Sequence, residues 1–438
     1  MRQVPLQVEL PRQLMCPVNS HGFIVPAAPE IVPGFNSPCL SRSLGNMNMD
    51  VIVVGLGAMG SATSYQLAKR GVKVVGIDRF SPPHVYGSTH GDTRITRQAI
   101  GEGRAYIPLA LRSHRLWREI EAETDTDLFT ACGGLILTGA EEMSGHHGSS
   151  DFFAETVSAA EDYGIEHELL TVDDVRDRFP QFRLAEDRRC YFEPGAGFVR
   201  PEAAIAAQLE LAQRYHGVVR KEERVLDIEP ASSEVIVRTD KDTYRARQVV
   251  ISAGPWISQL VGSDKIARLF SVYPQFLHWF ETADVSTMTP DRTPVYIWEF
   301  GPDEDDIFYG FPAIDGPGGG VKVATEQYRV KTDPDDLSRD VDPEESQAMF
   351  DHCIDGRLPL RGATVKSTRC LYTVTPDQKF IIDRHPEHEN IILASPCSGH
   401  GFKHSAAIGE SLAELVTEGR STIDLSAFSL GRFRKRLS

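Results

Sequence analysis

Residues 51–60, Val-Ile-Val-Val-Gly-Leu-Gly-Ala-Met-Gly, constrain the fold more than any other segment, because they predict a strand that runs directly into a glycine-rich turn and a helix. Gly55, Gly57 and Gly60 have the G-x-G-x-x-G spacing. In this fingerprint the first glycine permits a tight turn, the second lets a pyrophosphate approach the backbone, and the third lets the helix pack closely on the strand. The segment therefore predicts a turn that holds phosphates at a helix N-terminus.

The residues that follow complete this pattern. Residues 61–70 predict the helix, and residues 72–78 predict a second strand that ends in Asp78. Asp78 stands about 20 residues beyond the first glycine, where a carboxylate accepts hydrogen bonds from ribose hydroxyls and repels a 2′-phosphate. We therefore predict a dinucleotide site, and the fingerprint by itself leaves NAD and FAD open.

Composition limits the class of protein. A chain of 438 residues is long enough for two domains. Its net charge of −16 argues against nucleic acid and against an anionic membrane surface as partners. The chain contains no apolar run long enough for a membrane span. The cysteines are scattered and lack metal-ligand spacing, so we expect no metal site and a cytoplasmic location; they stand at positions 16, 39, 132, 190, 353, 370 and 397.

The first 46 residues differ from the rest of the chain. They contain seven prolines and show no helical or strand period. An apolar segment followed by a small-residue cleavage site is missing, so no secretory signal is expected. We expect either a disordered tail or a start assigned too far upstream, with Met47 or Met49 as the true start.

Later strands favour one of the two dinucleotides. Residues 248–252 predict a buried strand that ends in Ala253-Gly254. FAD proteins of the glutathione-reductase type return such a strand beside the first βαβ unit, whereas nicotinamide dehydrogenases continue with further regular βα units. Short strands separated by turns then predict an antiparallel sheet, at residues 275–281, 295–300, 307–310 and 320–324. The pattern closes with strands and a helix at residues 380–383, 390–394 and 406–415.

These elements predict a mixed α/β (α+β) fold of two domains. We expect a discontinuous, glutathione-reductase-type FAD-binding domain of residues 49–135, 195–262 and 365–433. A substrate domain built on the antiparallel sheet would comprise residues 136–194 and 263–364.

Four motifs outside the dinucleotide fingerprint carry a family resemblance. They are Gly-Asp-Thr-Arg-Ile-Thr-Arg at 91–97, Tyr-Gly-Phe-Pro at 309–312, Cys-Leu-Tyr-Thr-Val-Thr-Pro-Asp at 370–377 and Gly-His-Gly-Phe-Lys at 399–403. With them, residues 49–433 resemble the monomeric sarcosine oxidase and N-methyl-L-tryptophan oxidase family of the D-amino-acid-oxidase-like superfamily. Members of this family are flavoenzymes that oxidise secondary amino acids with O₂.

The resemblance implies a covalently bound FAD. Cys370 matches the cysteine that forms a thioether to the 8α carbon of the flavin, although a single buried cysteine is more often a small hydrophobic residue. Cys397 has no such counterpart and is interpreted as a packing residue. The expected cofactor-binding residues are Gly55, Gly57, Gly60, Asp78, Ser88, His90, Val225, Cys370, Gly399, Gly401 and Phe402.

The same resemblance assigns the substrate-binding residues. Arg97 and Lys403 match the clamp for the substrate carboxylate, for which a guanidinium supplies a planar pair of donors. Tyr309 and Tyr372 match two tyrosines that orient the substrate, and we expect them to act in catalysis.

Two further cations match catalytic positions, and one residue departs from the family. Arg94 matches an arginine beside the flavin that favours its anionic reduced form, and Lys322 matches the lysine that activates O₂. Glu326 stands where sarcosine oxidases carry a histidine. A carboxylate there makes the substrate pocket more acidic, which disfavours a second substrate carboxylate and favours an extra amine or indole N–H.

The function expected from these residues is oxidation of N-methyl or cyclic secondary amino acids. Hydride would pass to FAD and the electrons to O₂, yielding H₂O₂, and N-methyl substrates would release formaldehyde. By family precedent the protein would be a monomer. Alternatives are a dehydrogenase that passes electrons to a carrier, a glycine- or D-amino-acid-oxidase-like enzyme with non-covalent flavin, a nicotinamide dehydrogenase, and a non-catalytic flavin-binding module.

Overall fold

The first sheet is built around the predicted dinucleotide fingerprint. In the computed structural model, which describes residues 48–139, 151–316 and 318–437, β1 (Asn48–Val54) leads into α1 (Ala58–Lys69) and then β2 (Val74–Ile77). β1 pairs in parallel with β2 on one side and with β12 (Thr243–Ile251) on the other. The predicted strand–helix–strand unit is therefore confirmed, with the helix starting three residues earlier than expected. The predicted tail at residues 1–46 lies outside the described residues.

The remaining strands of this sheet come from distant parts of the chain. The strand order is β10-β11-β12-β1-β2-β9, and β19 pairs in parallel with β12 while β18 pairs with β19. The strands are β9 (Val218–Arg220), β10 (Val225–Pro230), β11 (Val235–Thr239), β18 (Ile381–His385) and β19 (His388–Ser395). The return of the 248–252 and 390–394 strands to the first βαβ unit is confirmed.

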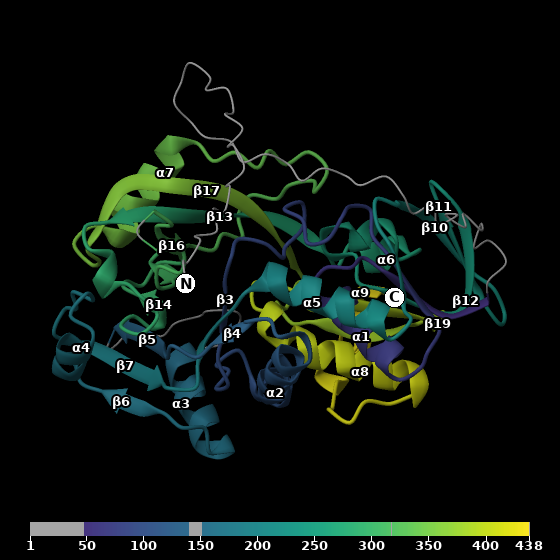
Figure 1. The fold of residues 1–438 in the computed structure, drawn as a ribbon, viewed down its shortest axis with the longest axis horizontal. Helices are drawn as coiled ribbons and strands as arrows, with labels where there is room; N and C mark the ends of the chain where they lie inside the picture. The colour runs from purple at the N-terminus through teal and green to yellow at the C-terminus, as the bar shows by residue number, and fades with distance from the viewer. Residues whose placement is uncertain (1–47, 140–150, 317, 438) are drawn as a thin grey trace, which may run out of the picture. The chain divides into compact units, whose positions relative to one another are not determined.

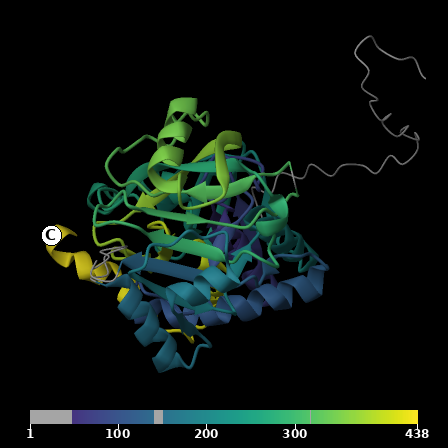
Figure 2. The ribbon, with the colours of Figure 1, turned by 90° about the vertical axis from the view of Figure 1, so that its left-hand side faces the viewer.

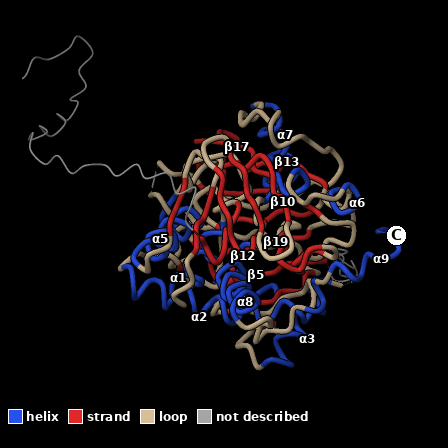
Figure 3. Tube along the Cα trace, turned by 90° about the vertical axis from the view of Figure 1, so that its right-hand side faces the viewer, coloured by secondary structure: helices blue, strands red, loops and turns tan. Residues whose placement is uncertain are grey.

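Helices cover one face of this sheet. α1 packs against α5 (Pro201–Arg214) and α8 (Ser405–Thr417), and α2 (Ile107–Thr124) packs against α8 (Figure 1). α1 is buried along most of its length, since Gly60 and small side chains such as Ala62 let it lie close to neighbouring backbone. Figure 3 shows the strands at the centre of the described part of the chain, with most of the helices outside them.

The second sheet carries the four short strands predicted between residues 275 and 324. Its order is β17-β13-β16-β15-β14-β5-β7-β6. Figure 2 shows this side of the structure facing the viewer, with the green strands of the later chain above the blue strands of the earlier chain. The strands are β5 (Gly134–Gly139), β6 (Glu168–Leu170), β7 (Arg188–Glu193), β13 (Ser271–Thr282), β14 (Val295–Glu299), β15 (Ile307–Gly310), β16 (Val321–Ala324) and β17 (Leu360–Val374). The sheet is antiparallel except at one pair, β5 and β14, which the long chain segment between them allows to run parallel.

A third, small sheet holds residues 94–96 of the 91–97 motif. It comprises β3 (Arg94–Thr96), β8 (Gly197–Val199) and β4 (Phe129–Thr130) in the order β3-β8-β4. The other helices are α3 (Phe152–Tyr163), α4 (Val172–Arg178), α6 (Asp264–Ala267), α7 (Pro343–Met349) and α9 (Arg434–Leu437). None of the helices within the described ranges is both long enough and apolar enough to cross a bilayer.

β17 connects the two large sheets. Its register with β13 runs from Leu360 to Val374, and the chain then continues into β18 of the first sheet. The expected domain boundary at residue 365 falls inside this strand. The mixed α/β fold class is as predicted, whereas the division into two domains stays a prediction.

Candidate active site

The three fingerprint glycines differ in the space around their Cα atoms. A Cβ on Gly55, which has a φ of +87°, would lie 2.7 Å from the carbonyl oxygen of Ser252, and one on Gly60 would lie 1.7 Å from that of Gly55. A Cβ on Gly57 would meet only Thr89 Oγ1, at 3.8 Å. The first and third positions are therefore filled by the protein itself, while the second faces open space in which a ligand can approach the backbone.

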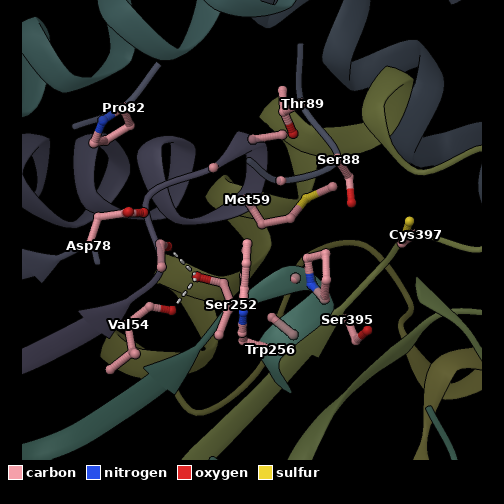
Figure 4. Close-up of a pocket in the computed structure, with 18 of the residues that line it drawn as sticks. Val54, Met59, Asp78, Pro82, Ser88, Thr89, Ser252, Trp256, Ser395 and Cys397 are labelled. Atoms are coloured by element: carbon pink, nitrogen blue, oxygen red, sulfur yellow. Dashed lines mark hydrogen bonds between the residues drawn. The ribbon is translucent and has the colours of Figure 1, made fainter. Parts of the chain in front are cut away.

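A large cavity lies at this turn, outside the carboxyl ends of the parallel strands (Figure 4). About 1330 Å³ of space lies between its walls, part of it open to solvent. Figure 4 shows Met59, Asp78, Ser88 and Cys397 arranged around it, with the Ser252 hydroxyl donating to the carbonyl of Val54 at 3.1 Å. In open α/β sheets ligands bind at this edge. The predicted cofactor residues that line it are Gly55, Gly57, Asp78, Ser88, Val225, Gly399, Gly401 and Phe402.

Asp78 is held firmly at the end of β2. One carboxylate oxygen accepts the amide N–H of Leu56 at 2.7 Å, and the other accepts that of Phe80 at 2.8 Å. Each oxygen keeps a further lone pair for a ligand hydroxyl, because a carboxylate has about four acceptor positions. Asp78 is therefore fixed in an orientation suited to a ribose.

Three predicted cofactor residues do not line this cavity. Gly60 lies behind the turn, and His90 and Cys370 are buried, with exposures of 2% and 1%. Burial and the nearby Arg94 lower the pKa of His90 to about 3, so its ring is neutral. Its Nε2 atom has no hydrogen-bond partner among the described residues, and a buried polar atom in that state fits a ligand as the missing partner.

A second cavity, of about 640 Å³, adjoins the first, and Arg94, Tyr372, Gly399 and Phe402 border both. It brings together residues from β3, β15, β17 and the loops after β3, β16 and β19, which are far apart in the sequence. All the predicted substrate-binding residues and three of the four predicted catalytic residues line it, namely Arg94, Arg97, Tyr309, Glu326, Tyr372 and Lys403.

A buried carboxylate joins the two cations of the predicted clamp. Glu102 lies 2.5 Å from Nη2 of Arg97 and 3.1 Å from Nζ of Lys403, and its side chain is only 2% exposed. Burial lowers the pKa of Lys403 to about 8, against the opposing effect of Glu102. Glu102 was not predicted as a site residue, although its place five positions after Arg97 in the same loop was a signal for it.

Lys322 is the predicted catalytic residue that lines neither cavity. Its side chain is buried at the centre of β16, and Nζ donates to the carbonyl oxygens of Gly91 at 2.6 Å and Thr93 at 2.8 Å. Burial, reinforced by the charge of Arg94, lowers its pKa well below the ordinary value. The loop that supplies these carbonyls is itself held by Glu202, whose Oε1 accepts the N–H groups of Gly91 and Asp92. Glu202 was likewise not predicted as a site residue.

Three phenols and Glu326 form a hydrogen-bonded group at the other side of the second cavity. Tyr328 donates to Oε2 of Glu326 at 2.7 Å, and Tyr372 donates to Oε1 at 3.3 Å. The hydroxyls of Tyr309 and Tyr372 lie 3.3 Å apart. Burial raises the pKa of Tyr372 well above its ordinary value, so its phenol stays protonated and serves as a donor to the carboxylate.

The two cysteines near the cavities have different positions. Cys370 is buried in β17, and burial raises the pKa of its thiol, opposed by the charges of Arg94 and Lys322. Cys397 lines the first cavity, and its Sγ accepts the N–H of Thr373 at 3.3 Å. Both belong to the apolar cluster around Tyr372, so the packing interpretation of Cys397 agrees with its surroundings.

Comparison with known proteins agrees with this geometry. Residues 50–415 match the DAO family, described as FAD dependent oxidoreductase. The chain is 38% identical to a monomeric sarcosine oxidase of Bacillus sp. (strain NS-129), covering 88% of this chain and 97% of the relative. It is 33% identical to an N-methyl-L-tryptophan oxidase of Yersinia pestis (strain Pestoides F), covering 89% of this chain and 100% of the relative. The predicted resemblance is therefore confirmed.

Solved structures share the fold at lower identity. NikD, an unusual amino acid oxidase essential for nikkomycin biosynthesis, superposes with a TM-score of 0.73 at 24% identity, covering 87% of this chain and 97% of that one. Glycine oxidase from Geobacillus kaustophilus superposes with a TM-score of 0.69 at 22% identity, covering 87% and 98%. The fingerprint, the cavity it borders and the family match together decide between the two dinucleotides: this chain belongs to the FAD dependent oxidoreductase family and is an FAD-dependent oxidoreductase.

Proposed function

We propose that this protein is an oxidase of secondary amino acids, N-methyl or cyclic, that uses O₂ as electron acceptor. The observation that carries the proposal is the junction of the two cavities at Arg94 and Tyr372. One cavity borders the dinucleotide fingerprint, and the other holds two cations suited to a carboxylate. A small amino acid bound there lies next to a cofactor in the first cavity.

The residues for FAD are those of the first cavity. Gly57 leaves room for the pyrophosphate, Asp78 accepts from a ribose, and Val225 borders the same cavity. When bound, FAD supplies the redox chemistry: it accepts a hydride from the carbon beside the substrate nitrogen and returns the two electrons to O₂, giving H₂O₂. We further propose that Cys370 carries the flavin through a thioether, supported by the motif at 370–377 and by its place beside Tyr372 in the apolar cluster.

The chain's own side chains bind and orient the substrate. Arg97 and Lys403 bind its carboxylate through charge-assisted hydrogen bonds. Because the Tyr372 hydroxyl donates its hydrogen bond to Glu326, its oxygen can accept an N–H from the substrate amine. The clamp and this acceptor together fix two points of the substrate, and such positioning lowers the entropic part of the barrier.

Two cations, the half-buried Arg94 and the buried Lys322, act on the charge that develops during the reaction. Arg94 borders both cavities and favours negative charge on the reduced cofactor. The two carbonyl oxygens that accept hydrogen bonds from Lys322 favour its ammonium form against the effect of burial, and this ammonium stabilises reduced oxygen species. The imine product leaves and hydrolyses in water, which releases formaldehyde when an N-methyl group was oxidised.

The covalent bond is tested by acid precipitation of the purified protein. We expect the yellow colour to stay in the pellet of the wild type. In Cys370→Ser we expect it to be released into the supernatant. Cys397→Ser is the matched control, since it removes the other thiol of the same apolar cluster. Colour released from the wild type would contradict covalent attachment, and colour released only by Cys397→Ser would move it to that residue.

The activity is tested by a peroxide assay on a panel of N-methyl and cyclic secondary amino acids. We expect peroxide in proportion to substrate consumed, and formaldehyde only from the N-methyl compounds. Reduction of an artificial dye without O₂ consumption would instead favour a dehydrogenase.

We also propose that the protein is a monomer, as the name of the sarcosine oxidase relative suggests. We further propose a cytoplasmic location, which is supported by free thiols at all five described cysteines.

A further inference from the structure

Glu193 is a buried carboxyl group where the second sheet meets the loop that follows Arg97. It is the last residue of β7, and it is only 1% exposed. Arg97 lines the substrate cavity, whereas Glu193 lies outside it. Because a buried carboxyl group needs hydrogen-bond donors, its partners show what it holds in place.

Both oxygens of Glu193 accept hydrogen bonds from the start of this loop. Oε1 accepts the amide N–H of Gln98 at 2.7 Å, and Oε2 accepts that of Ala99 at 3.1 Å. Oε2 also accepts a hydrogen bond from the hydroxyl of Tyr191, which lies in the same strand, at 3.1 Å. Burial raises the pKa of Glu193, and these three donors and the charge of Arg97 oppose that effect. Glu193 thus fixes two successive backbone N–H groups that are 95 and 94 positions away in the sequence.

Ala99 connects Glu193 to Arg97. The N–H of this buried residue donates to Glu193, and its carbonyl oxygen accepts a hydrogen bond from Nη1 of Arg97. Nη2 of Arg97 donates to Glu102 at 2.5 Å, and the guanidinium lies 4.8 Å from the ring centroid of Phe152. The orientation of the guanidinium therefore depends on three contacts, and Glu193 holds the backbone that makes one of them.

We propose, building on the function proposed above, that Glu193 is a positioning residue for the substrate carboxylate. It holds the backbone of Gln98 and Ala99 at the place where the Ala99 carbonyl oxygen orients the guanidinium of Arg97. A guanidinium has more N–H groups than its contacts with Ala99 and Glu102 use, so an oriented Arg97 still offers donors to a carboxylate. A cation that is oriented before the substrate arrives binds it more tightly, because less side-chain freedom is lost on binding.

The test measures how well the flavin-loaded protein distinguishes a carboxylate from a neutral group of the same shape. Propionate and propionamide differ in the charge that Arg97 binds, and ligand-observed NMR titration at pH 7 gives both dissociation constants without catalysis. We expect the wild type to prefer propionate. Glu193→Met removes both acceptor oxygens, and we expect it to reduce this preference roughly 10-fold, the lower end of the range for a hydrogen bond to a charged group.

Glu193→Gln is the conservative variant, and it decides the question if Glu193→Met does not fold. Its side chain keeps one acceptor oxygen, but in either orientation its NH₂ group faces a backbone N–H, so we expect a smaller loss of the preference. Tyr191→Phe is the matched control, since it removes the third donor to Glu193 without changing the loop, and it should keep the preference. A full preference in Glu193→Gln, or equal weakening of both ligands, would mean that Glu193 supports only the fold and would overturn the proposal.

A double-mutant cycle tests whether the effect of Glu193 depends on Arg97. Arg97→Met should lose much of the preference for propionate, and adding Glu193→Gln to it should cause no further loss. A further loss as large as that in the wild-type background would show that Glu193 acts independently of Arg97, which contradicts the proposal.

Failure of the proposed function would give a different result. If no secondary amino acid yields peroxide while the Glu193 variants lose the preference as expected, the proposed function is refuted and the positioning role stands. If the wild type binds propionate and propionamide equally, Arg97 forms no carboxylate subsite, and the positioning role is refuted whatever the peroxide assay shows.

Discussion

The carboxylate of Glu102 lies 3.1 Å from the ammonium of Lys403, and both side chains are buried beside the substrate cavity. The same carboxylate is 2.5 Å from Arg97. The two cations assigned to the substrate carboxylate therefore already share one internal partner. The negative charge of Glu102 favours the charged form of Lys403 against the effect of burial, and a substrate carboxylate that enters the cavity shares both cations with Glu102.

The first prediction concerns the pH dependence of carboxylate binding. Burial lowers the pKa of Lys403 to about 8, so its ammonium is present below that pH and is lost as the pH rises through it. We expect inhibition by propionate, which has no amine to titrate, to weaken above about pH 8. Lys403→Arg keeps its charge over this range and should show flat inhibition. A wild-type inhibition constant that does not change between pH 7 and pH 9.5 would contradict the prediction.

The elements that were predictable from sequence are those set by local pattern. The β1–α1–β2 unit follows from hydrophobic runs and three glycines within a short segment, and β15 has the predicted bounds of 307–310. β13 is longer than predicted, 271–282 against 275–281, because it pairs with β17 over nearly its full length. Such pairing depends on a distant strand, and a local pattern contains no information about it.

The two site residues that were not predicted make contacts with residues far away in the sequence. Glu202 binds the backbone N–H of Gly91, which is 111 positions away, and Glu102 binds Lys403. Neither glutamate belongs to a motif, and isolated acids are usually solvated. Only the fold shows that Glu102 is buried against two cations and that the half-buried Glu202 accepts hydrogen bonds from backbone N–H groups. The predicted catalytic and binding residues were reached through family motifs, and their roles stay proposals.

The second prediction separates the role of Lys322 from that of a neighbouring surface lysine. Lys322 and Lys366 both lie over the ring of Trp279, at 5.5 Å and 4.5 Å from its centroid, but only Lys322 is buried. We expect Lys322→Met to slow reoxidation of the reduced enzyme by O₂ roughly 10²- to 10³-fold, because a fixed charge is lost. Flavin reduction by substrate should change much less, and Lys366→Met should match the wild type. Stopped-flow measurement of the two half-reactions checks this.

The third prediction concerns the support of the 91–94 loop by Glu202. In Glu202→Ala the N–H groups of Gly91 and Asp92 lose their acceptor, and an unsatisfied buried group costs about 1–3 kcal/mol. We expect urea unfolding to show a loss of that size. Glu202→Gln retains an amide oxygen at the same place and should recover most of the stability. If both variants unfold like the wild type, these hydrogen bonds do not stabilise the loop.

The last prediction tests the turn that faces the first cavity. A Cβ on Gly57 meets only Thr89 Oγ1 at 3.8 Å, so the backbone of Gly57→Ala fits without a clash, but its methyl group occupies the space reserved for the pyrophosphate. We expect a folded protein with strongly reduced flavin content, measured by absorbance after purification and by titration of the apoprotein with FAD. Gly318→Ala, at a position with no neighbour within 4 Å, should bind FAD normally. Gly60→Ala places its Cβ 1.7 Å from the carbonyl oxygen of Gly55 and should lower the stability of the fold itself. Normal flavin content in Gly57→Ala would show that the cofactor does not approach the backbone at this turn.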